Sequence, residues 1–449
     1  MDSGIVTRLL DKFEIEPKNL NCIVELVKHS RESGRPRLSY ILAKGLLSII
    51  SKTPDLYAVD LVQLYYELSI CCWYMKKIQE GQVISNKLIF DKAVPHHLRQ
   101  AVHSNITWYL TPLDFDDAFQ VPFNSPMLDV GNSSSVERWR PLNPGLFKFE
   151  DKLIINCRCV NYNQRGTSYT SLQPDGKIRT RNFLIECDEN FAPIKQIEVV
   201  DKLNMVKFPK WIEGQEDCRF CVVNNKLMFS SVTFYLTREF LPQIAVSQIS
   251  TSKLLEAFNN PSQTEILIES TTRMLGPDPG RCEKNWLPFN YNGELHFVYL
   301  YDPFVILKPN FSSTSSSTPS SSSTLTPPSS SSQCEVVEVQ TSKFDLTRFR
   351  GSAAPIEFDN GFLLIVHEVI FNGNGERTYV HRFLWFDSNL SNSNLHVSNA
   401  WYLKEPGIEF CSGMLKISNF VYIGAGLKDK EAWIFKISED KIRSMLKSM

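Results

Sequence analysis

The chain has 449 residues, of which 43 % are hydrophobic and 22 % charged, which predicts a globular protein of several domains and excludes a disordered or fibrous one. Its 48 Lys and Arg against 49 Asp and Glu give a net charge of -1, so no basic field favours nucleic acid or an anionic membrane. Scattered cysteines, 11 in number, favour reduced thiols over a disulfide framework. With no signal-peptide pattern and no apolar run of roughly 18 residues, we expect a cytoplasmic protein.

Residues 1–135 are predicted to form a helical region. Apolar side chains recur at steps of three and four residues in 38–50 and 61–72, and further helical segments are predicted at 81–90 and 98–110. Successive amphipathic segments with short connections indicate helical hairpins of tetratricopeptide type, which would offer a surface for a protein partner. A plain helical cap on the next domain is the alternative.

Residues 136–449 change to short apolar runs separated by Asn, Asp and Gly, the pattern of strands and turns. One pattern, a polar turn followed by an aliphatic strand, recurs five times, at 150–155, 224–229, 292–297, 359–364 and 417–422. Further strands follow most copies, so each unit is predicted to be a multi-stranded sheet. Because such a sheet cannot bury both faces alone, radial stacking into a five-bladed β-propeller is the expected solution, with a β-sandwich as the alternative.

The segment 311–334 consists almost entirely of Ser, Thr and Pro. Such a composition buries too little apolar surface to offset the entropy of ordering the chain. We therefore expect a disordered insertion in a surface loop between the third and fourth copies of the repeat, where long insertions cost little.

Polar clusters recur near the predicted strand ends. In a propeller the innermost strands converge on the axis, so these side chains can meet in one central pocket although they are far apart in the sequence. The candidates for catalysis are Asp217, Glu216 and Glu409. The candidates for substrate binding are Arg219, Arg158, Arg181, Asn182, Lys284, Asn285, Trp286, Arg350 and His367.

The segment 214–219, with Glu216, Asp217, Cys218 and Arg219, resembles the Glu-Asp-Pro-Arg segment of the five-bladed-propeller β-mannoside phosphorylases and the related β-1,2-mannosyltransferases. Further segments that carry the resemblance, which spans about 141–437, are 143–145, 181–183, 284–289, 350–352, 367–369, 381–383, 407–411 and 429–432. Cys218 departs from the family's proline. The resemblance also covers predicted sugar-active proteins in which a helical region precedes the propeller.

This resemblance implies that Asp217 is the general acid that protonates the glycosidic oxygen, directly or through a sugar hydroxyl, during an inverting reaction. Such an acid must stay protonated near neutral pH, which burial and a neighbouring carboxylate such as Glu216 favour, whereas Arg219 favours the ionised form. The alternative is that Glu216, Asp217 and Arg219 form a structural ion pair between sheets.

The second substrate implied by the resemblance is phosphate or a sugar nucleotide, which needs cationic side chains in the pocket. Arg158, Arg181, Lys284 and Arg350 are the candidates. Trp286 either offers an aromatic face for a pyranose ring or is a buried core residue. Glu409, or Glu368 beside His367, would serve as the base of a hydrolase.

No metal or cofactor is expected, because the single Cys218-x-x-Cys221 pair has no second pair at zinc spacing. The sequence thus predicts a glycosyl-transferring or phosphorolysing enzyme that acts on a mannoside-like sugar. The rival prediction is a non-catalytic adaptor or sugar-binding propeller whose helical region binds a protein.

Overall fold

The structure is a computed structural model of the chain. It describes residues 2–52, 56–131, 137–165, 168–202, 211–234, 236, 241–278, 280–311, 331–371, 374–390 and 394–448. The chain divides into two compact units, one of residues 1–112 with 343–345 and 399–401, the other of residues 113–342, 346–398 and 402–449. Within the described ranges, no helix is both long and apolar enough to cross a membrane.

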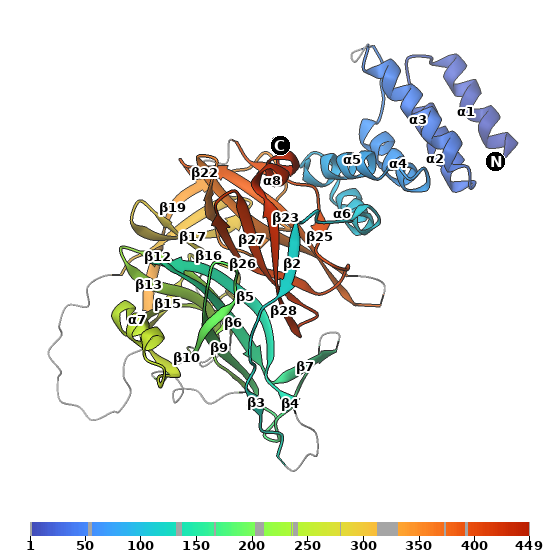
Figure 1. Cartoon of the computed structure of the whole chain (residues 1–449). Helices are drawn as coiled ribbons and strands as arrows, with labels where there is room; N and C mark the ends of the chain where they lie inside the picture. Colours follow the sequence, from blue (N-terminus) through green and yellow to red (C-terminus); the bar gives the residue numbers. More distant parts are fainter. Residues whose placement is uncertain are drawn as a thin grey trace. The chain divides into compact units, whose positions relative to one another are not determined.

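The first unit is helical, as predicted. Its helices are α1 (Ser3–Ile15), α2 (Asn21–Glu32), α3 (Pro36–Ile50), α4 (Leu61–Tyr74), α5 (Ile78–Phe90), α6 (His96–Asn105) and the 3-10 turn η1 (Ile106–Tyr109). Each helix packs on the next one along the chain (Figure 1). Asp60 caps α4 by accepting a hydrogen bond from the Gln63 amide, and Pro36 takes the first turn of α3, where its missing N–H costs nothing. The tetratricopeptide relationship stays a prediction.

The second unit contains five antiparallel sheets. The first has β5 (Arg140–Phe149), β6 (Lys152–Val160), β9 (Ile178–Cys187) and β10 (Pro193–Val200). The second has β12 (Glu216–Val223), β13 (Lys226–Thr233), β14 (Gln243–Ile249) and β15 (Glu265–Leu275). The third has β16 (Leu287–Tyr291), β17 (Glu294–Tyr301), β18 (Phe304–Pro309) and β19 (Ser331–Gln340).

The fourth sheet is built on β22 (Gly361–Phe371) and β23 (Arg377–Asp387), flanked by β20 (Arg350–Gly351), β21 (Ile356–Phe358) and β24 (His396–Val397). The fifth has the order β2 (Asp117–Gln120), β28 (Glu431–Ser438), β27 (Phe420–Leu427) and β26 (Glu409–Ile417). The remaining elements are β1 (Thr111–Pro112), β3 (Met127–Leu128), β4 (Glu137–Arg138), β7 (Tyr162–Arg165), β8 (Ser168–Ser171), β11 (Ile212–Glu213), β25 (Trp401–Tyr402), β29 (Lys447–Ser448), α7 (Thr251–Asn259) and α8 (Glu439–Met445).

The five sheets close into a ring. Strand β5 contacts β12, β12 contacts β16, β17 contacts β20, β21 and β23 contact β26, and β26 returns to β5. At the closing seam, a Cβ atom on Gly424 would lie 2.2 Å from the carbonyl oxygen of Pro144, so only glycine permits this approach of β27 to β5. The second unit is therefore a five-bladed β-propeller, as predicted.

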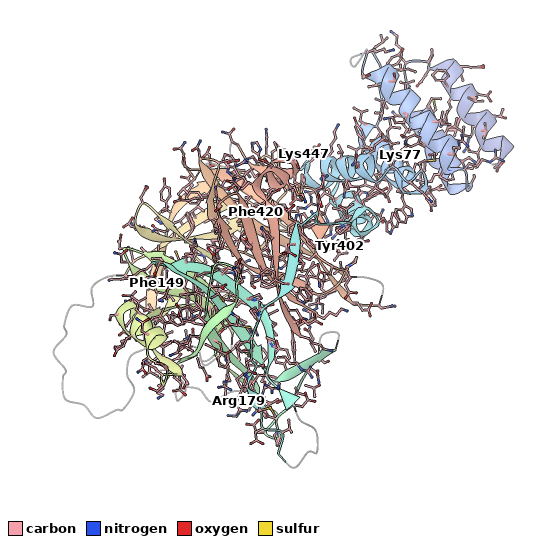
Figure 2. All side chains as sticks on the ribbon, viewed as in Figure 1. Lys77, Phe149, Arg179, Tyr402, Phe420 and Lys447 are labelled. Carbon is pink, nitrogen blue, oxygen red and sulfur yellow. The ribbon has the colours of Figure 1, made fainter. Side chains whose placement is uncertain are left out.

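The five sequence repeats are the hairpins between the first and second strands of the sheets. Their aliphatic runs form β6, β13, β17, β22 and β27. The polar turn residues adopt positive φ, as at Glu150 (53°), Asn224 (48°), Asn292 (52°), Asp359 (46°) and Ser418 (53°), a conformation in which Asn, Asp and Gly are enriched. Figure 2 labels Phe149, at the end of β5, and Phe420, at the start of β27, on these sheets.

Two predicted boundaries differ from the structure. The helical unit ends at Pro112 and not at 135, because β2 pairs with β28, with Asp117 opposite Lys436, and completes the fifth sheet. Most of the serine-rich tract predicted at 311–334 lies outside the described residues. Its last residues belong to a strand, since Ser331 begins β19 and Cys334 pairs with Pro309 of β18.

The propeller core buries titratable groups, and His381 on β23 is one of them. Its Nε2 lies 3.1 Å from the Glu409 carbonyl oxygen, and burial lowers the pKa of His381 from its usual 6.5 to about 4. The unfolded chain therefore binds a proton that the folded chain does not between these values. We expect this residue to contribute a fall of about 3 kcal/mol in the unfolding free energy as the pH drops from 6.5 to 4.

Chemical denaturation of wild type and His381→Gln at about pH 7 and about pH 5 would measure this contribution. The glutamine variant keeps a polar side chain but cannot titrate, so its unfolding free energy should fall less between the two pH values. An equal fall in both proteins would contradict the prediction.

Candidate functional site

A cavity of about 450 Å³ opens in the propeller, and side chains from all five sheets or their connections line it. The polar and aromatic residues in the lining are Asn143, Arg158, Tyr162, Gln164, Tyr169, Trp211, Glu216, Asp217, Phe234, Lys284, Asn285, His367, Arg377, Tyr379, Phe410 and Asp429. Six of the twelve predicted site residues are among them: Asp217, Glu216, Arg158, Lys284, Asn285 and His367. The ring of sheets therefore brings together residues that are more than 200 positions apart in the sequence.

Strand β12 presents Glu216 and Asp217 to this cavity. Its pairing with β13 shifts register between Glu216 and Arg219, and Asp217 has a φ of 51°. The neighbouring strand β5 has a comparable shift after Leu142, and Asn143 has a φ of 46°. Such irregularities redirect side chains that a regular strand would alternate between its two faces. Both strands therefore leave the regular pleat at the cavity.

Arg158 on β6 holds the two neighbouring carboxylates. Its Nη1 donates to Asp217 Oδ1 at 2.7 Å, and its Nη2 lies 3.1 Å from Glu216 Oε1. Asn143 Nδ2 also donates to Asp217 Oδ1, at 2.9 Å. Burial by itself would raise the pKa of Asp217, but the positive charges of Arg158 and Arg219 outweigh it and lower that pKa. Asp217 is thus held as a carboxylate.

Two more predicted residues support this arrangement from behind the cavity wall. Arg219 is buried, donates from Nε to the Ser352 carbonyl oxygen at 2.8 Å, and donates from Nη1 to the backbone oxygen of Asp217 at 3.1 Å. Asn182 donates from Nδ2 to the carbonyl oxygen of Gln215 at 2.8 Å. Neither residue lines the cavity, so both act by positioning the segment that carries Glu216 and Asp217.

Asp429 is a cavity carboxyl that we did not select as a site residue from the sequence, although its segment belonged to the resemblance. It lies in the turn between β27 and β28, with a φ of 52°. Burial raises the pKa of Asp429, and this effect outweighs the positive charge of Arg158. The surroundings therefore lower the pKa of Asp217 and raise the pKa of Asp429, although both aspartates line the same cavity.

His367 on β22 also lines the cavity. Its Nδ1 lies 2.8 Å from Ser352 Oγ, and its ring packs against Tyr379 and Phe410, with centroids 5.3 and 5.4 Å away. Burial holds the pKa of His367 well below its usual value, and the charges of His381 and Arg219 add to this effect. His367 is therefore neutral near pH 7 and can accept or donate one hydrogen bond, but it supplies no cation for a phosphate.

The cavity also has aromatic walls that the sequence did not single out. Trp211 has 69 % of its surface exposed and Tyr169 has 49 %. Tyr169 packs edge-on against Tyr162 with centroids 5.1 Å apart, and Arg377 forms hydrogen bonds with Tyr169 and Tyr379. Exposed aromatic faces beside polar groups are suited to the apolar faces of a pyranose ring. The sequence does not distinguish these residues from other exposed aromatic residues, because they line a cavity only once the sheets have closed into a ring.

Arg181, which we predicted to bind substrate, does not line the cavity. It lies on β9, the third strand of its sheet, and its Nε donates to Glu198 Oε1 on the outer strand β10 at 2.6 Å. Its guanidinium packs 5.1 Å from the rings of Trp139 and Phe183. An ion pair toward the outer edge of the sheet therefore satisfies this side chain.

Glu409, Trp286 and Arg350 are also absent from the cavity lining. The Glu409 carboxylate accepts hydrogen bonds from the backbone amides of residues 403, 404 and 405 at 2.6, 2.8 and 3.0 Å, and so fixes a loop. Trp286 is fully buried and donates from Nε1 to Glu283 Oε2 at 2.9 Å. Arg350 donates to the carbonyl oxygens of residues 347 and 349. Each of the three has a local structural role.

Comparisons with known proteins identify structural likeness without sequence likeness. No family model matches the chain, and no curated protein matches it in sequence. A β-1,2-mannobiose phosphorylase from Listeria innocua aligns with 74 % of this chain and 99 % of its own, at a TM-score of 0.42 and 12 % identity. A mannose phosphorylase from Leishmania mexicana aligns with 79 % of this chain and 96 % of its own, at a TM-score of 0.41 and 12 % identity.

A GDP-Man-dependent mannosyltransferase from Leishmania mexicana aligns with 72 % of this chain and 90 % of its own, at a TM-score of 0.40 and 9 % identity. Independently of these likenesses, the strand pairing and the cavity define this chain as a five-bladed β-propeller with a charged, aromatic-walled central site.

Proposed function

We propose that this protein is a carbohydrate-active enzyme that cleaves or transfers a β-mannoside-like glycoside in the propeller cavity, with inversion at the anomeric carbon. The observation that carries the proposal is the meeting of Glu216, Asp217 and Asp429 with cationic and exposed aromatic side chains in one cavity. Carboxyl groups supply the proton transfers of glycoside chemistry, and aromatic faces hold the sugar ring. The preference for a mannoside comes from the sequence resemblance at 214–219.

The charges of the cavity favour a neutral sugar over a densely anionic ligand. Among the described lining residues the cations are Arg158, Lys284 and Arg377, and the carboxyl groups are Glu216, Asp217 and Asp429. Arg158 already contacts two of these carboxylates. Lys284 forms no ion pair with the described residues and is the side chain that we propose to meet phosphate or a nucleotide phosphate, if either is the acceptor or donor.

The test is a turnover assay with wild type and Asp217→Asn. The substrates are β-1,2-mannobiose with and without inorganic phosphate, GDP-mannose with a mannose acceptor, and 2,4-dinitrophenyl β-mannoside. We expect turnover of at least one of them, and a loss of roughly 10²-fold or more in kcat/KM on the substitution. Asparagine keeps the size and tolerates the positive φ, so the fold should be retained. Absence of turnover in wild type with every donor would favour the adaptor.

Trp211→Ala is expected to raise KM for an oligosaccharide about 3- to 10-fold with little change in kcat. The exposed indole would stack on a sugar outside the reacting ring, and such contacts contribute about 0.5–1.5 kcal/mol. Ile194→Ala is the matched control, because Ile194 is also exposed but lies on β10 and outside the cavity lining. Steady-state kinetics with a disaccharide and a monosaccharide glycoside measure the difference. An unchanged KM for the disaccharide would remove Trp211 from the binding site.

A further inference from the structure

Asp217 and Asp429 face the same cavity, but their carboxyl groups are held in different ways. Oδ1 of Asp217 accepts two hydrogen bonds, from Arg158 at 2.7 Å and from Asn143 at 2.9 Å. An acceptor that receives donors from a guanidinium and an amide is stabilised as an anion and has no proton to give. A reaction that needs a protonated carboxyl therefore has to find it elsewhere in the cavity.

Asp429 meets that requirement. Its carboxyl makes no hydrogen bond or ion pair with the described residues, although it lines the cavity. The backbone around it is fixed, because the amide of Lys428 donates to the Ile408 carbonyl at 2.7 Å and the amide of Lys430 donates to the Leu427 carbonyl at 3.0 Å. The side chain is thus placed by a tight turn, while its oxygen atoms stay available to a ligand.

The charged groups that act on Asp429 come from three other strands. They are Arg158 of β6, Glu216 and Asp217 of β12, and Arg377 of β23. Arg158 and Arg377 lower the pKa of Asp429, Asp217 and Glu216 raise it, and desolvation by burial is the largest influence. Burial raises the pKa of Asp429. The raised pKa of Asp429 agrees with the geometry, in which Asp217 accepts two hydrogen bonds and Asp429 accepts none from the described residues.

We propose that Asp429, and not Asp217, is the proton donor to the leaving group in the reaction assigned above, with Asp217 as the ionised partner. The proposal rests on the proposed function. In the hydrolytic case, the Asp429 proton passes to the glycosidic oxygen as the bond from C1 to that oxygen breaks and its electron pair stays on the oxygen. A water oxygen bonds to C1 from the opposite face, and its proton passes to Asp217. The products are the free sugar and the alcohol, and the two aspartates re-equilibrate with solvent.

The test compares Asp429→Asn with Asp217→Asn on two donors, β-1,2-mannobiose and 2,4-dinitrophenyl β-mannoside. The disaccharide needs a proton on its leaving oxygen, whereas dinitrophenolate leaves without one. We expect Asp429→Asn to lose roughly 10²- to 10⁴-fold in kcat/KM on the disaccharide and less than about tenfold on the aryl glycoside. Asp217→Asn should lose activity on both donors. Asp217 accepts the proton of the attacking water, and a better leaving group does not take over that role. Asparagine suits the positive φ at both positions.

The pH profile gives a second measurement. The raised pKa of Asp429 sets the alkaline limb of kcat/KM, since activity is lost as the acid deprotonates, and this limb should disappear in Asp429→Asn. Rescue of Asp217→Asn by the aryl glycoside, with none for Asp429→Asn, would overturn the assignment and leave the proposed function standing. A wild type that is inactive toward both donors, with or without phosphate, would overturn the assignment of Asp429, and absence of turnover with GDP-mannose and a mannose acceptor as well would remove the proposed function. Circular dichroism of each variant checks that the fold is intact.

Discussion

Arg158→Met is expected to lower the unfolding free energy by about 3 kcal/mol at neutral pH, because it leaves two partly buried carboxylates without their shared cation. In wild type the guanidinium lies 2.7 Å from Asp217 Oδ1 and 3.1 Å from Glu216 Oε1, and only 6 % of the Arg158 side chain is exposed. Methionine keeps an unbranched apolar stem but carries no charge and no guanidinium. Chemical denaturation at about pH 7 measures the change.

The direction in which the unfolding free energy of Arg158→Met changes with pH tests whether the unpaired carboxylates cause the loss of stability. In wild type the pKa of Asp217 is lowered, so its contribution to stability is present above the unfolded pKa of about 3.8 and is lost as the pH falls through the folded value. Without Arg158, the largest of the influences that lower this pKa, we expect burial to outweigh the remaining charge of Arg219 and to raise the pKa of Asp217 above the unfolded value. The variant should then recover part of its stability as the pH is lowered from about 7 to about 5.

Arg158→Lys serves as the matched control for charge. Lysine keeps a cation but cannot reach both carboxylates with a planar fork, so an intermediate loss of stability is expected. A loss of less than about 1 kcal/mol in Arg158→Met, or no recovery at lower pH, would contradict the view that this guanidinium holds the site together. Either result would also weaken the assignment of Asp217 as an ionised group.

Arg382→Met is expected to lower the unfolding free energy by a similar amount, about 3–5 kcal/mol, without touching the cavity. Arg382 on β23 and Glu368 on β22 form an ion pair of 2.6 Å, with side-chain exposures of 0 % and 1 %. Arg382 also donates from Nη1 to the Ser398 carbonyl oxygen at 3.1 Å. Removing the arginine leaves a carboxylate in a region that water does not reach.

The double variant Arg382→Met with Glu368→Leu separates the ion pair from packing. Replacing both charges by apolar side chains of similar volume removes the unpaired charge, so the double variant should be more stable than Arg382→Met alone. Lys253→Met breaks the exposed pair of Lys253 with Glu269 and should change the unfolding free energy by less than about 1 kcal/mol. Equal losses in the buried and exposed pairs would show that burial of the charges is not the cause.

The five-fold repeat was the part of the fold that could be read from the sequence with the least ambiguity. A polar turn with positive φ followed by an aliphatic strand is a local pattern, since the turn chemistry and the strand alternation are set by neighbouring residues. The pattern therefore located β6, β13, β17, β22 and β27. The helical spacing in 38–50 and 61–72 is local in the same way and corresponds to α3 and α4.

The candidate site could be predicted only in part. Glu216, Asp217 and Arg158 do line one cavity, because they lie on strands that converge when the sheets form a ring, and their roles in binding or catalysis stay predictions. Arg181 and Glu409 also lie in polar segments near strand ends, but they do not line the cavity. Arg181 pairs with Glu198 on β10, and Glu409 accepts hydrogen bonds from the loop 403–405. No local pattern reveals such a partner.

The sequence by itself determined the division into a helical and a strand-rich part, the number of sheet repeats and the presence of a reactive-looking acidic segment, because each depends on residues close together in the chain. The tertiary structure decided which strand closes the ring, which charges share a cavity and which aspartate is clamped. Those outcomes depend on contacts between distant segments, such as β2 with β28 and Arg158 with Asp217, and on the desolvation that the packed sheets impose.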